Sequence, residues 1–382
     1  MPKKTERYWP RILLLWSLSI VAVLLLFEFA VRMFFPQVLN YTEFDENLMF
    51  RHIPNHEFRY FSPEFDNMVT FNSKGLRDVE HQYEKATGTY RILVLGDSLP
   101  IGFQVKMNET FPKLLEQKLN AGEKPGLTYE VINAGVGGYG SENELLFYET
   151  EGRKYKPDMV LLAFSMSDID ESMISPLITI KDGKIHRNVP VEASLPKETA
   201  LYCSRYSHLC AWMYNRALRG LKESELIRTI STKIGLSSGG DDKVNTKSGL
   251  SIYEKENSDS LERGLNETFS IVLEFNRKLK EDHAVLVIVP MPQLEQVDEG
   301  GREAFILATG LNGDQADMDK FQRIAQKFSK ENGIRYIDPL DGLKAQNVNN
   351  SFYFNTGGHF NEEGHEVMAK YLYDGLKKQK FI

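Results

Sequence analysis

The chain of 382 residues has little cysteine, no excess of positive charge and no internal repeat. Its two cysteines, Cys203 and Cys210, are too few for a disulfide scaffold or a zinc site. A formal charge of −7 and a pI near 5.7, with no Lys/Arg cluster beyond the extreme N-terminus, argue against a nucleic-acid-binding protein. Hydrophobic residues make up 42% of the chain, enough for the core of one large α/β domain or of two average domains.

Charge is almost absent from one stretch, residues 12–31, in which Glu28 is the only charged residue. As a helix these 20 residues would extend roughly 30 Å, the thickness of the bilayer hydrocarbon core. Basic residues precede the stretch and acidic residues follow it, so the positive-inside rule places the N-terminus in the cytoplasm. We therefore predict a cytoplasmic tail over residues 1–11 and a single-pass signal anchor over residues 12–32. The remainder is then extracytoplasmic, and periplasmic in a Gram-negative cell.

A cleaved signal peptide is the alternative interpretation of this apolar stretch. No clear small-x-small cleavage site follows it, and the segment "FEFAVRMFFP" is bulky, which favours the anchor. A buried core helix is a poor explanation because the stretch has no polar face.

From residue 89 onward, apolar runs typical of buried strands alternate with amphipathic helices. The five predicted strands are "YRILVLG", "TYEVINAG", "DMVLLAF", "AVLVIVPMP" and "IRYIDPL". This alternation predicts a three-layer α/β/α fold with a mainly parallel five-stranded sheet, in which ligands bind beyond the carboxyl ends of the strands. We assign residues 89–382 to this domain and residues 33–88 to a lead-in that packs on it.

The alternation of strands and helices is interrupted at about residues 170–280. We predict that this stretch is an insertion, which could be a lid, a partner surface or a tolerated surface excursion. The segment "LYCSRYSHLCAWMYNRALRGL" is expected to be helical after Ser204 or Ser207, and the Gly/Ser/Asp-rich "GLSSGGDDKVNTKSGLS" follows it. A continuous helix would hold Cys203 and Cys210 about 10 Å apart, too far for a disulfide. A disulfide therefore requires Cys203 to precede the helix, and the sequence leaves this open.

One serine stands at the end of the first predicted strand, in "RILVLGDSLPIGF". Ser98 follows two residues that favour a sharp turn, which places its hydroxyl at the carboxyl edge of the sheet near a helix N-terminus. Backbone N–H groups there can stabilise an oxyanion, but serine is also a common helix cap. The local motif alone leaves both roles open, with Asp97 expected to bond nearby backbone.

Four segments together resemble a known family. "VLGDSLPIGF", "VINAGVGGYGSENELL", "KPDMVLLAFSMSDID" and "GGHFNEEGH" occur in the order of the sequence blocks of SGNH/GDSL hydrolases. The chain is most similar to membrane-anchored bacterial members, which share a lead-in like "FNSKGLRD". The resemblance covers residues of about 45–165 and 284–376. It implies the flavodoxin-like SGNH hydrolase fold and serine ester hydrolase or acyl-transferase chemistry, without a cofactor or metal.

The resemblance also implies roles for individual residues. Ser98 would be the nucleophile, His359 its base, and the backbone N–H groups of Ser98 and Gly138 two oxyanion donors. A glycine suits the second position because it allows the backbone to approach the substrate closely. His365 also lies in the last block, and we expect it to cap or pack against a helix rather than bind a metal.

Two positions depart from the family pattern. Ser167 stands where the family has an asparagine as third oxyanion donor, and loss of such a donor typically lowers the rate about 100- to 1,000-fold. Thr356 and Gly357 stand where an aspartate would orient His359, and loss of that acid in a serine-protease triad costs about 10⁴-fold. The possible orienting groups are Thr356 itself, a distant carboxylate such as Asp338, or a backbone carbonyl.

Two functions remain open at this point. The first is a membrane-tethered, extracytoplasmic serine ester hydrolase or acyl transferase that acts on acyl esters, for which cell-surface glycans or lipids are the expected substrates. The second is a catalytically degenerate binding or assembly protein in cell-envelope polysaccharide metabolism. We expect no nucleic-acid partner, and the sequence gives no indication of the oligomeric state.

Overall fold

The structure is a computed structural model that describes residues 8–122, 126–169, 177–181, 184–187, 195–223, 252–311, 313–347 and 352–381. The chain packs into two compact units. The first consists of Met1–Phe44 and Glu192–Gly240, and the second of Asp45–Val191 and Asp241–Ile382. The predicted lead-in is thus divided, with residues 33–44 in the first unit and residues 45–88 in the second.

The first unit contains α1 (Trp9–Phe34), α6 (Leu195–Tyr206) and α7 (His208–Glu223), and β1 (Thr42–Asp45) crosses the boundary between the units. The second unit contains β2 (Met49–His52), β3 (Glu57–Phe61), β4 (Asp66–Thr70), β5 (Thr89–Gly96), α2 (Ser98–Ile101), η1 (Met107–Glu109), α3 (Phe111–Ala121), β6 (Thr128–Asn133), α4 (Ser141–Thr150), η2 (Gly152–Tyr155), β7 (Met159–Phe164), β8 (Ile178–Lys181), β9 (Lys184–Arg187), α10 (Asp259–Glu281), β10 (Val285–Pro290), α11 (Leu294–Val297), α12 (Glu299–Thr309), η3 (Gly313–Gln315), α13 (Lys320–Glu331), β11 (Arg335–Tyr336), α14 (Leu340–Gln346) and α15 (Glu362–Lys378).

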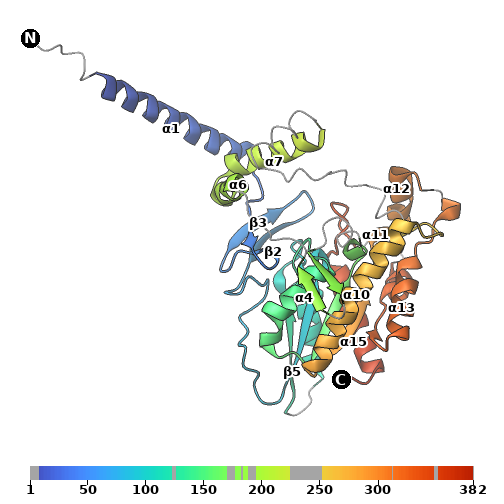
Figure 1. Ribbon diagram of the computed structural model, residues 1–382. Helices are drawn as coiled ribbons and strands as arrows, with labels where there is room; N and C mark the ends of the chain where they lie inside the picture. Colours follow the sequence, from blue (N-terminus) through green and yellow to red (C-terminus); the bar gives the residue numbers. More distant parts are fainter. Residues whose placement is uncertain are drawn as a thin grey trace, which may run out of the picture. The chain divides into compact units, whose positions relative to one another are not determined.

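A five-stranded sheet in the order β11-β10-β7-β5-β6 forms the centre of the second unit (Figure 1). All four strand pairs are parallel, which confirms the predicted fold class and each of the five predicted strands. This is the flavodoxin-like strand order: the chain passes from β5 to β6 on one side and then crosses to β7 on the other side of β5. The carboxyl end of β5 therefore lies at the topological switch point, where such sheets form a crevice.

The sheet separates two hydrophobic cores because successive side chains of a strand point to opposite faces. In β5, Leu93 and Leu95 belong to one core and Ile92 and Val94 to the other, and all four are buried. Helices α4, α10 and α13 contribute apolar side chains to the first core, whereas α3 and α15 contribute to the second. Apolar residues buried on both faces explain why β5 reads as a continuous hydrophobic run.

Helix α10 falls inside the stretch that the sequence assigned to an insertion. Its apolar face is buried, with Leu261, Ile271 and Phe275 in the first hydrophobic core. It lies between β7 and β10 in the chain and contacts α4 and β10, so it is the crossover helix of a parallel strand pair. The Gly/Ser/Asp-rich segment that precedes it lies outside the described residues.

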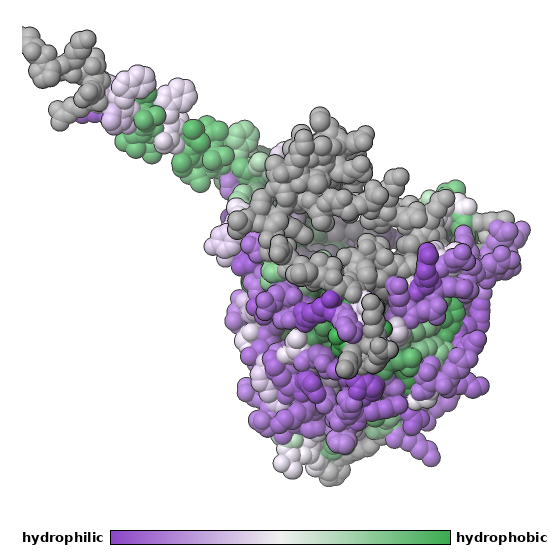
Figure 2. Space-filling view, viewed as in Figure 1, coloured by the Kyte–Doolittle hydropathy of each residue, from purple (hydrophilic) through white to green (hydrophobic). Residues whose placement is uncertain are grey.

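Helix α1 of the first unit is long and apolar enough to cross a membrane by length and composition. Its 26 residues extend about 39 Å, somewhat beyond the predicted span. The hydrophobic character of its surface is visible in Figure 2, where apolar side chains cover most of the helix. Only Val31 among its residues is buried against the protein.

The first unit also settles the geometry of the two cysteines. Cys203 lies in α6 and Cys210 in α7, and the chain leaves helical geometry at Ser207 between them. This break brings their Cα atoms to 5.7 Å, and the two residues form a disulfide. The condition that Cys203 precede the helix of Cys210 is therefore met.

Candidate active site

The nucleophile candidate sits on a tight turn between β5 and α2. Asp97 caps α2, because its Oδ1 accepts a hydrogen bond from Leu99 N at 3.1 Å, and Ser98 is the first helical residue. A neighbouring loop lies close against this turn: a Cβ at Gly135 would lie 2.8 Å from Ile101 N. The capping role that Ser98 could have played thus belongs to Asp97.

The base candidate comes from the other end of the chain. His359 lies in the loop before α15, and its Nε2 is 2.8 Å from the Oγ of Ser98, 261 positions away in the sequence. Both side chains are partly buried. A neutral imidazole protonated on Nδ1 can accept the hydrogen of the serine hydroxyl at Nε2. The structure therefore brings the two predicted residues into the contact that general-base activation of a serine requires.

The other ring nitrogen of His359 has an unusual environment. Nδ1 is buried and no described side chain accepts a hydrogen bond from it, but the backbone of Gly357 acts on the ring as a hydrogen-bond acceptor. The backbone of Gly357 lies beside it: a Cβ added there would be 3.3 Å from Nδ1. Burial lowers the pKa of His359, while the Asp97 carboxyl and the Gly357 backbone oppose this effect. The imidazole is therefore neutral at neutral pH, as a base must be before it takes a proton.

Neither predicted orienting side chain bonds to His359. The backbone N–H of Thr356 donates to Oε2 of Glu64 at 2.6 Å. The carboxylate of Asp338 accepts hydrogen bonds from Tyr336 Oη and from Leu340 N, both at 2.9 Å. Asp338 also follows the edge strand β11, which two strands, β10 and β7, separate from β5. These contacts give no support to either residue as the substitute for the missing aspartate.

Asp97 is the carboxyl group that acts on His359 from nearby. It is buried, and burial raises its pKa against the opposing effects of Leu99 N, Ser167 and the charge of His359. The hydroxyl of Ser167 lies 3.2 Å from Oδ2 of Asp97 and 3.0 Å from Oγ of Ser165. The predicted third oxyanion donor is thus beside the site, but its single hydrogen is already engaged.

The glycine-rich loop between β6 and α4 lies alongside Ser98. A Cβ placed on Gly137 would be 3.8 Å from Cβ of Ser98, whereas one on Gly138 would be 3.6 Å from the ring of Phe50. Gly138 has φ of +83°, a backbone conformation that favours glycine. The role of Gly138 N–H as oxyanion donor stays a prediction.

A buried arginine of the lead-in holds the segment that follows the nucleophile. Nη1 of Arg77 donates to the carbonyl of Ile101 at 2.7 Å and to that of Gly102, and Nη2 donates to Val105. Burial lowers the pKa of Arg77 to about 10, so the group remains charged at neutral pH. Three carbonyls of one loop thus converge on one cation.

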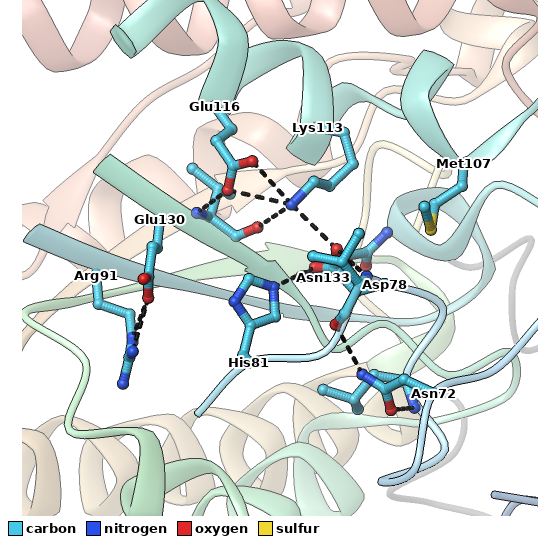
Figure 3. A network of polar contacts seen from close by, with 12 residues as sticks. Asn72, Asp78, His81, Arg91, Met107, Lys113, Glu116, Glu130 and Asn133 are labelled. Carbon is cyan, nitrogen blue, oxygen red and sulfur yellow. Dashed lines mark hydrogen bonds and ion pairs between the residues drawn. The ribbon is translucent and has the colours of Figure 1, made fainter. Parts of the chain in front are cut away.

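The next lead-in residue, Asp78, ties several elements together (Figure 3). Its Oδ2 accepts from Asn133 N at 2.8 Å, and its Oδ1 lies 3.0 Å from Nζ of Lys113. Asn133 Nδ2 in turn donates to the carbonyl of Pro100 at 2.7 Å. Burial acts to raise the pKa of Asp78, but His81 and Lys113 outweigh it and hold the pKa below its usual value. The network fixes the lead-in, β6 and α2 against one another.

A second lead-in residue holds the loop of the base. Glu64 accepts hydrogen bonds from the backbone N–H of Asn355 at 3.1 Å and of Thr356 at 2.6 Å, and from the Asn355 side chain at 2.9 Å. The bonds from Thr356 and Asn355 lower the pKa of Glu64 to about 2. Sequence reasoning missed Glu64, Arg77 and Asn133. Arg77 lies in "FNSKGLRD" and Asn133 in "VINAGVGGYGSENELL", two segments that carry the family resemblance, whereas no sequence signal pointed to Glu64.

His365 has the packing role expected of it. Its Nδ1 accepts a hydrogen bond from Phe111 N at 3.1 Å, and its ring packs on the rings of Phe111 and Phe360. Burial lowers the pKa of His365 to about 3, so the ring is neutral.

The comparisons with known proteins found only distant similarity. No family model and no curated protein matches the chain. Among solved structures, the chain is similar to TesA (11% identity, TM-score 0.40, covering 75% of this chain and 98% of that one). It is also similar to the psychrotrophic esterase EstA from Pseudoalteromonas sp. (14% identity, TM-score 0.39, covering 76% of this chain and 99% of that one). A third similar structure is Axe2, an acetylxylan esterase from Geobacillus stearothermophilus (12% identity, TM-score 0.40, covering 77% of this chain and 96% of that one). At these identities and TM-scores, a shared activity does not follow from the similarity.

Proposed function

We propose that the chain is a serine ester hydrolase or acyl transferase of the SGNH type. The observation that carries this proposal is the 2.8 Å contact between Ser98 Oγ and His359 Nε2 at the switch point of the sheet. In the reaction, Ser98 Oγ attacks the acyl carbonyl carbon while His359 Nε2 takes its proton. Backbone N–H groups of Ser98 and Gly138 stabilise the oxyanion.

The intermediate then collapses and the ester oxygen leaves with the proton held on His359. The acyl group remains on Ser98 until water attacks it, or until the hydroxyl of an acceptor does. His359 again takes the proton of the attacking oxygen, so one residue serves as base and acid in each half-reaction.

The buried Nδ1 of His359 makes this a dyad rather than a triad. An orienting acid fixes the tautomer and stabilises the imidazolium that forms in each step. Here the negative charge of Asp97 acts through space on the imidazolium, and the backbone of Gly357 faces Nδ1. We therefore expect turnover well below that of a complete triad.

The proposal includes a membrane tether through α1. Glu28, in the last turns of the apolar run, accepts hydrogen bonds from Ser207 Oγ, His208 N and Leu209 N at 2.7 to 3.0 Å. Cleavage after the apolar run would remove these contacts, which favours an anchor over a cleaved signal peptide. With the N-terminus in the cytoplasm, the Ser98–His359 site lies outside the membrane. Its substrates there are acylated cell-surface glycans or lipids.

The second candidate is a binding or assembly protein on a degenerate hydrolase fold. It is favoured by one observation: no carboxylate of the described residues accepts a hydrogen bond from Nδ1 of His359.

Labelling with a fluorescent serine-directed phosphonate distinguishes the two candidates in the full chain kept in detergent. The hydrolase requires labelling that is lost in Ser98→Ala and strongly slowed in His359→Ala. Ser270→Ala changes a partly buried serine whose hydroxyl bonds to carbonyls of its own helix α10; it is the matched control and should label like the wild type. Failure of the wild type to label, with its disulfide intact, supports the binding protein.

A further inference from the structure

The first unit presents a small helical hairpin next to the apolar helix. This hairpin consists of α6 and α7, residues 195–223, joined at Ser207 and closed by the Cys203–Cys210 disulfide. Helix α7 packs along α1. The carboxylate of Glu28 accepts from Ser207 Oγ, His208 N and Leu209 N, so α1 itself caps the start of α7.

Two further contacts hold the hairpin to the chain just beyond α1. Gln37 N donates to Nδ1 of His208 at 2.9 Å, and Asn215 Nδ2 donates to Oε1 of Gln37 at 3.3 Å. Ala211, on the same side of α7, is buried. One face of α7 is therefore fixed against α1 and the chain that follows α1.

A neighbouring face of α7 carries apolar and basic side chains that are exposed or half-buried. Met213 is 58% exposed, Trp212 is half-buried, and the guanidinium of exposed Arg216 lies over the Trp212 ring at 5.4 Å. These residues and Leu209 follow the i, i+3, i+4 spacing of one helical face. In α6, Tyr202 and Tyr206 are 63% and 60% exposed and pack against each other with ring centroids 5.3 Å apart.

Basic and aromatic side chains predominate between residues 200 and 217 of the hairpin, although Glu198 of α6 is exposed and Arg205 lies 3.7 Å from Glu43. Residues 200–217 contain two arginines and no aspartate or glutamate, together with four aromatic residues. Tyrosine and tryptophan prefer the headgroup level of a bilayer, where an apolar ring and a polar tip are both accommodated. Arginine at this level can bond lipid phosphates.

We propose that the α6–α7 hairpin lies on the outer surface of the bilayer that α1 crosses, with Trp212 and Met213 at the boundary between headgroups and acyl chains. This inference rests on the proposed anchor. Helix α1 extends about 39 Å against a hydrocarbon core of about 30 Å, so its last turns reach the headgroup level. Because Glu28 fixes the start of α7 to those turns, the face of α7 that carries Trp212 and Met213 is held at the same depth. Arg216 then meets lipid phosphates.

The position of the three tryptophans gives a direct test. Trp9 and Trp16 lie in α1 and Trp212 in α7, so Trp9→Phe/Trp16→Phe leaves Trp212 as the only tryptophan of the full chain. This variant is reconstituted in bilayers of phosphatidylcholine and phosphatidylglycerol. In separate samples the acyl chains carry bromine close to the headgroup or close to the terminal methyl.

The proposal predicts blue-shifted Trp212 emission, with greater loss of fluorescence from bromine near the headgroup than from bromine near the methyl end. Arg216→Glu should reduce that loss, whereas Arg187→Glu, an exposed arginine of the second unit, should leave it unchanged. A gel-shift assay of Cys203 and Cys210 shows that the hairpin is intact in each variant.

Three results would overturn the proposal. Emission that soluble iodide quenches freely places the hairpin in water. Blue-shifted emission that brominated lipid leaves unchanged places it against protein, either a second copy or another membrane protein. Stronger quenching from the methyl end places it inside the hydrocarbon core. Resistance of the chain to carbonate extraction, measured in parallel, separates failure of the hairpin from failure of the anchor.

Discussion

Removal of the Arg77 guanidinium should loosen the nucleophile loop and destabilise the second unit. Arg77→Met keeps the length and apolar stem of the side chain but leaves the carbonyls of Ile101, Gly102 and Val105 without their charged donor. Hydrogen bonds to charged groups contribute about 1.5–3 kcal/mol each. Three bonds at the lower end of that range give about 4–5 kcal/mol, of which relaxation and water recover a part, so we expect a net loss of about 3 kcal/mol.

This destabilisation should lower the Tm of the second unit, which can be followed separately from that of the first unit. All three tryptophans lie in the first unit, whereas 12 of the 17 tyrosines lie in the second, so tyrosine signals in the near-ultraviolet report mainly on the second unit. A destabilisation of 1 kcal/mol lowers Tm by about 2 °C in a large domain, so Arg77→Met should lower Tm by roughly 6 °C. The value of kcat should fall as well, because the loop after α2 no longer has a single position.

Arg59→Met is the matched control, since Arg59 is a lead-in arginine whose ion-pair partner, Asp66, is also exposed. Exposed ion pairs contribute little to stability. The control should retain both Tm and kcat. If Arg77→Met also retained the wild-type Tm and kcat, Arg77 would not hold the loop after α2 in place, and the role assigned to it would be wrong.

Three further predictions concern the site itself. Glu64→Gln should lower kcat, because the loop that carries His359 loses charged acceptors. Glu84→Gln, which changes an exposed glutamate elsewhere in the second unit, should leave kcat unchanged. The depressed pKa of Glu64 means that its contribution is complete above the unfolded value of 4.5 and is lost as pH falls through about 2, so the effect should be full at pH 7. The acidic limb of kcat/KM should have its midpoint below pH 6.5, since burial lowers the pKa of His359, and Asp97→Asn should move it lower still; a midpoint above 6.5 would contradict this. Gly135→Ala should cost about 1–3 kcal/mol in urea denaturation, because its Cβ would lie 2.8 Å from a backbone nitrogen of the nucleophile turn.

The sheet could be predicted because its strands are buried on both faces. Runs such as those of β5 and β7 have no polar alternation, and helices with clear periodicity separate them. Helix α10 was harder to assign from the sequence, although its hydrophobic periodicity is strong. It follows a long polar stretch, and the predicted insertion includes both. The boundary between the two units was not predictable, since it depends on which parts of the chain pack against α1.

The site was predictable only where the order of sequence blocks pointed to it. Ser98 and His359 are separated by 261 positions, and nothing local to either residue indicates the other. Glu64 lies 292 positions from Thr356, so its hydrogen bonds to the loop that carries His359 could not be predicted from the sequence. The environment of Nδ1 likewise depends on backbone geometry at Gly357, which side-chain identities do not specify.

The central claim is that Ser98 and His359 act as one catalytic pair without an orienting acid. In a serine protease, loss of the serine or the histidine lowers kcat about 2 × 10⁶-fold and loss of the acid about 3 × 10⁴-fold, so a pair without its acid retains a contribution of about 100-fold. The most direct test is the turnover of p-nitrophenyl acetate by the full chain and by Ser98→Ala, His359→Ala and the double variant. We predict that each single variant loses about 100-fold in kcat and that the double variant loses no more than either single variant. Equal turnover by the wild type and Ser98→Ala would contradict the claim.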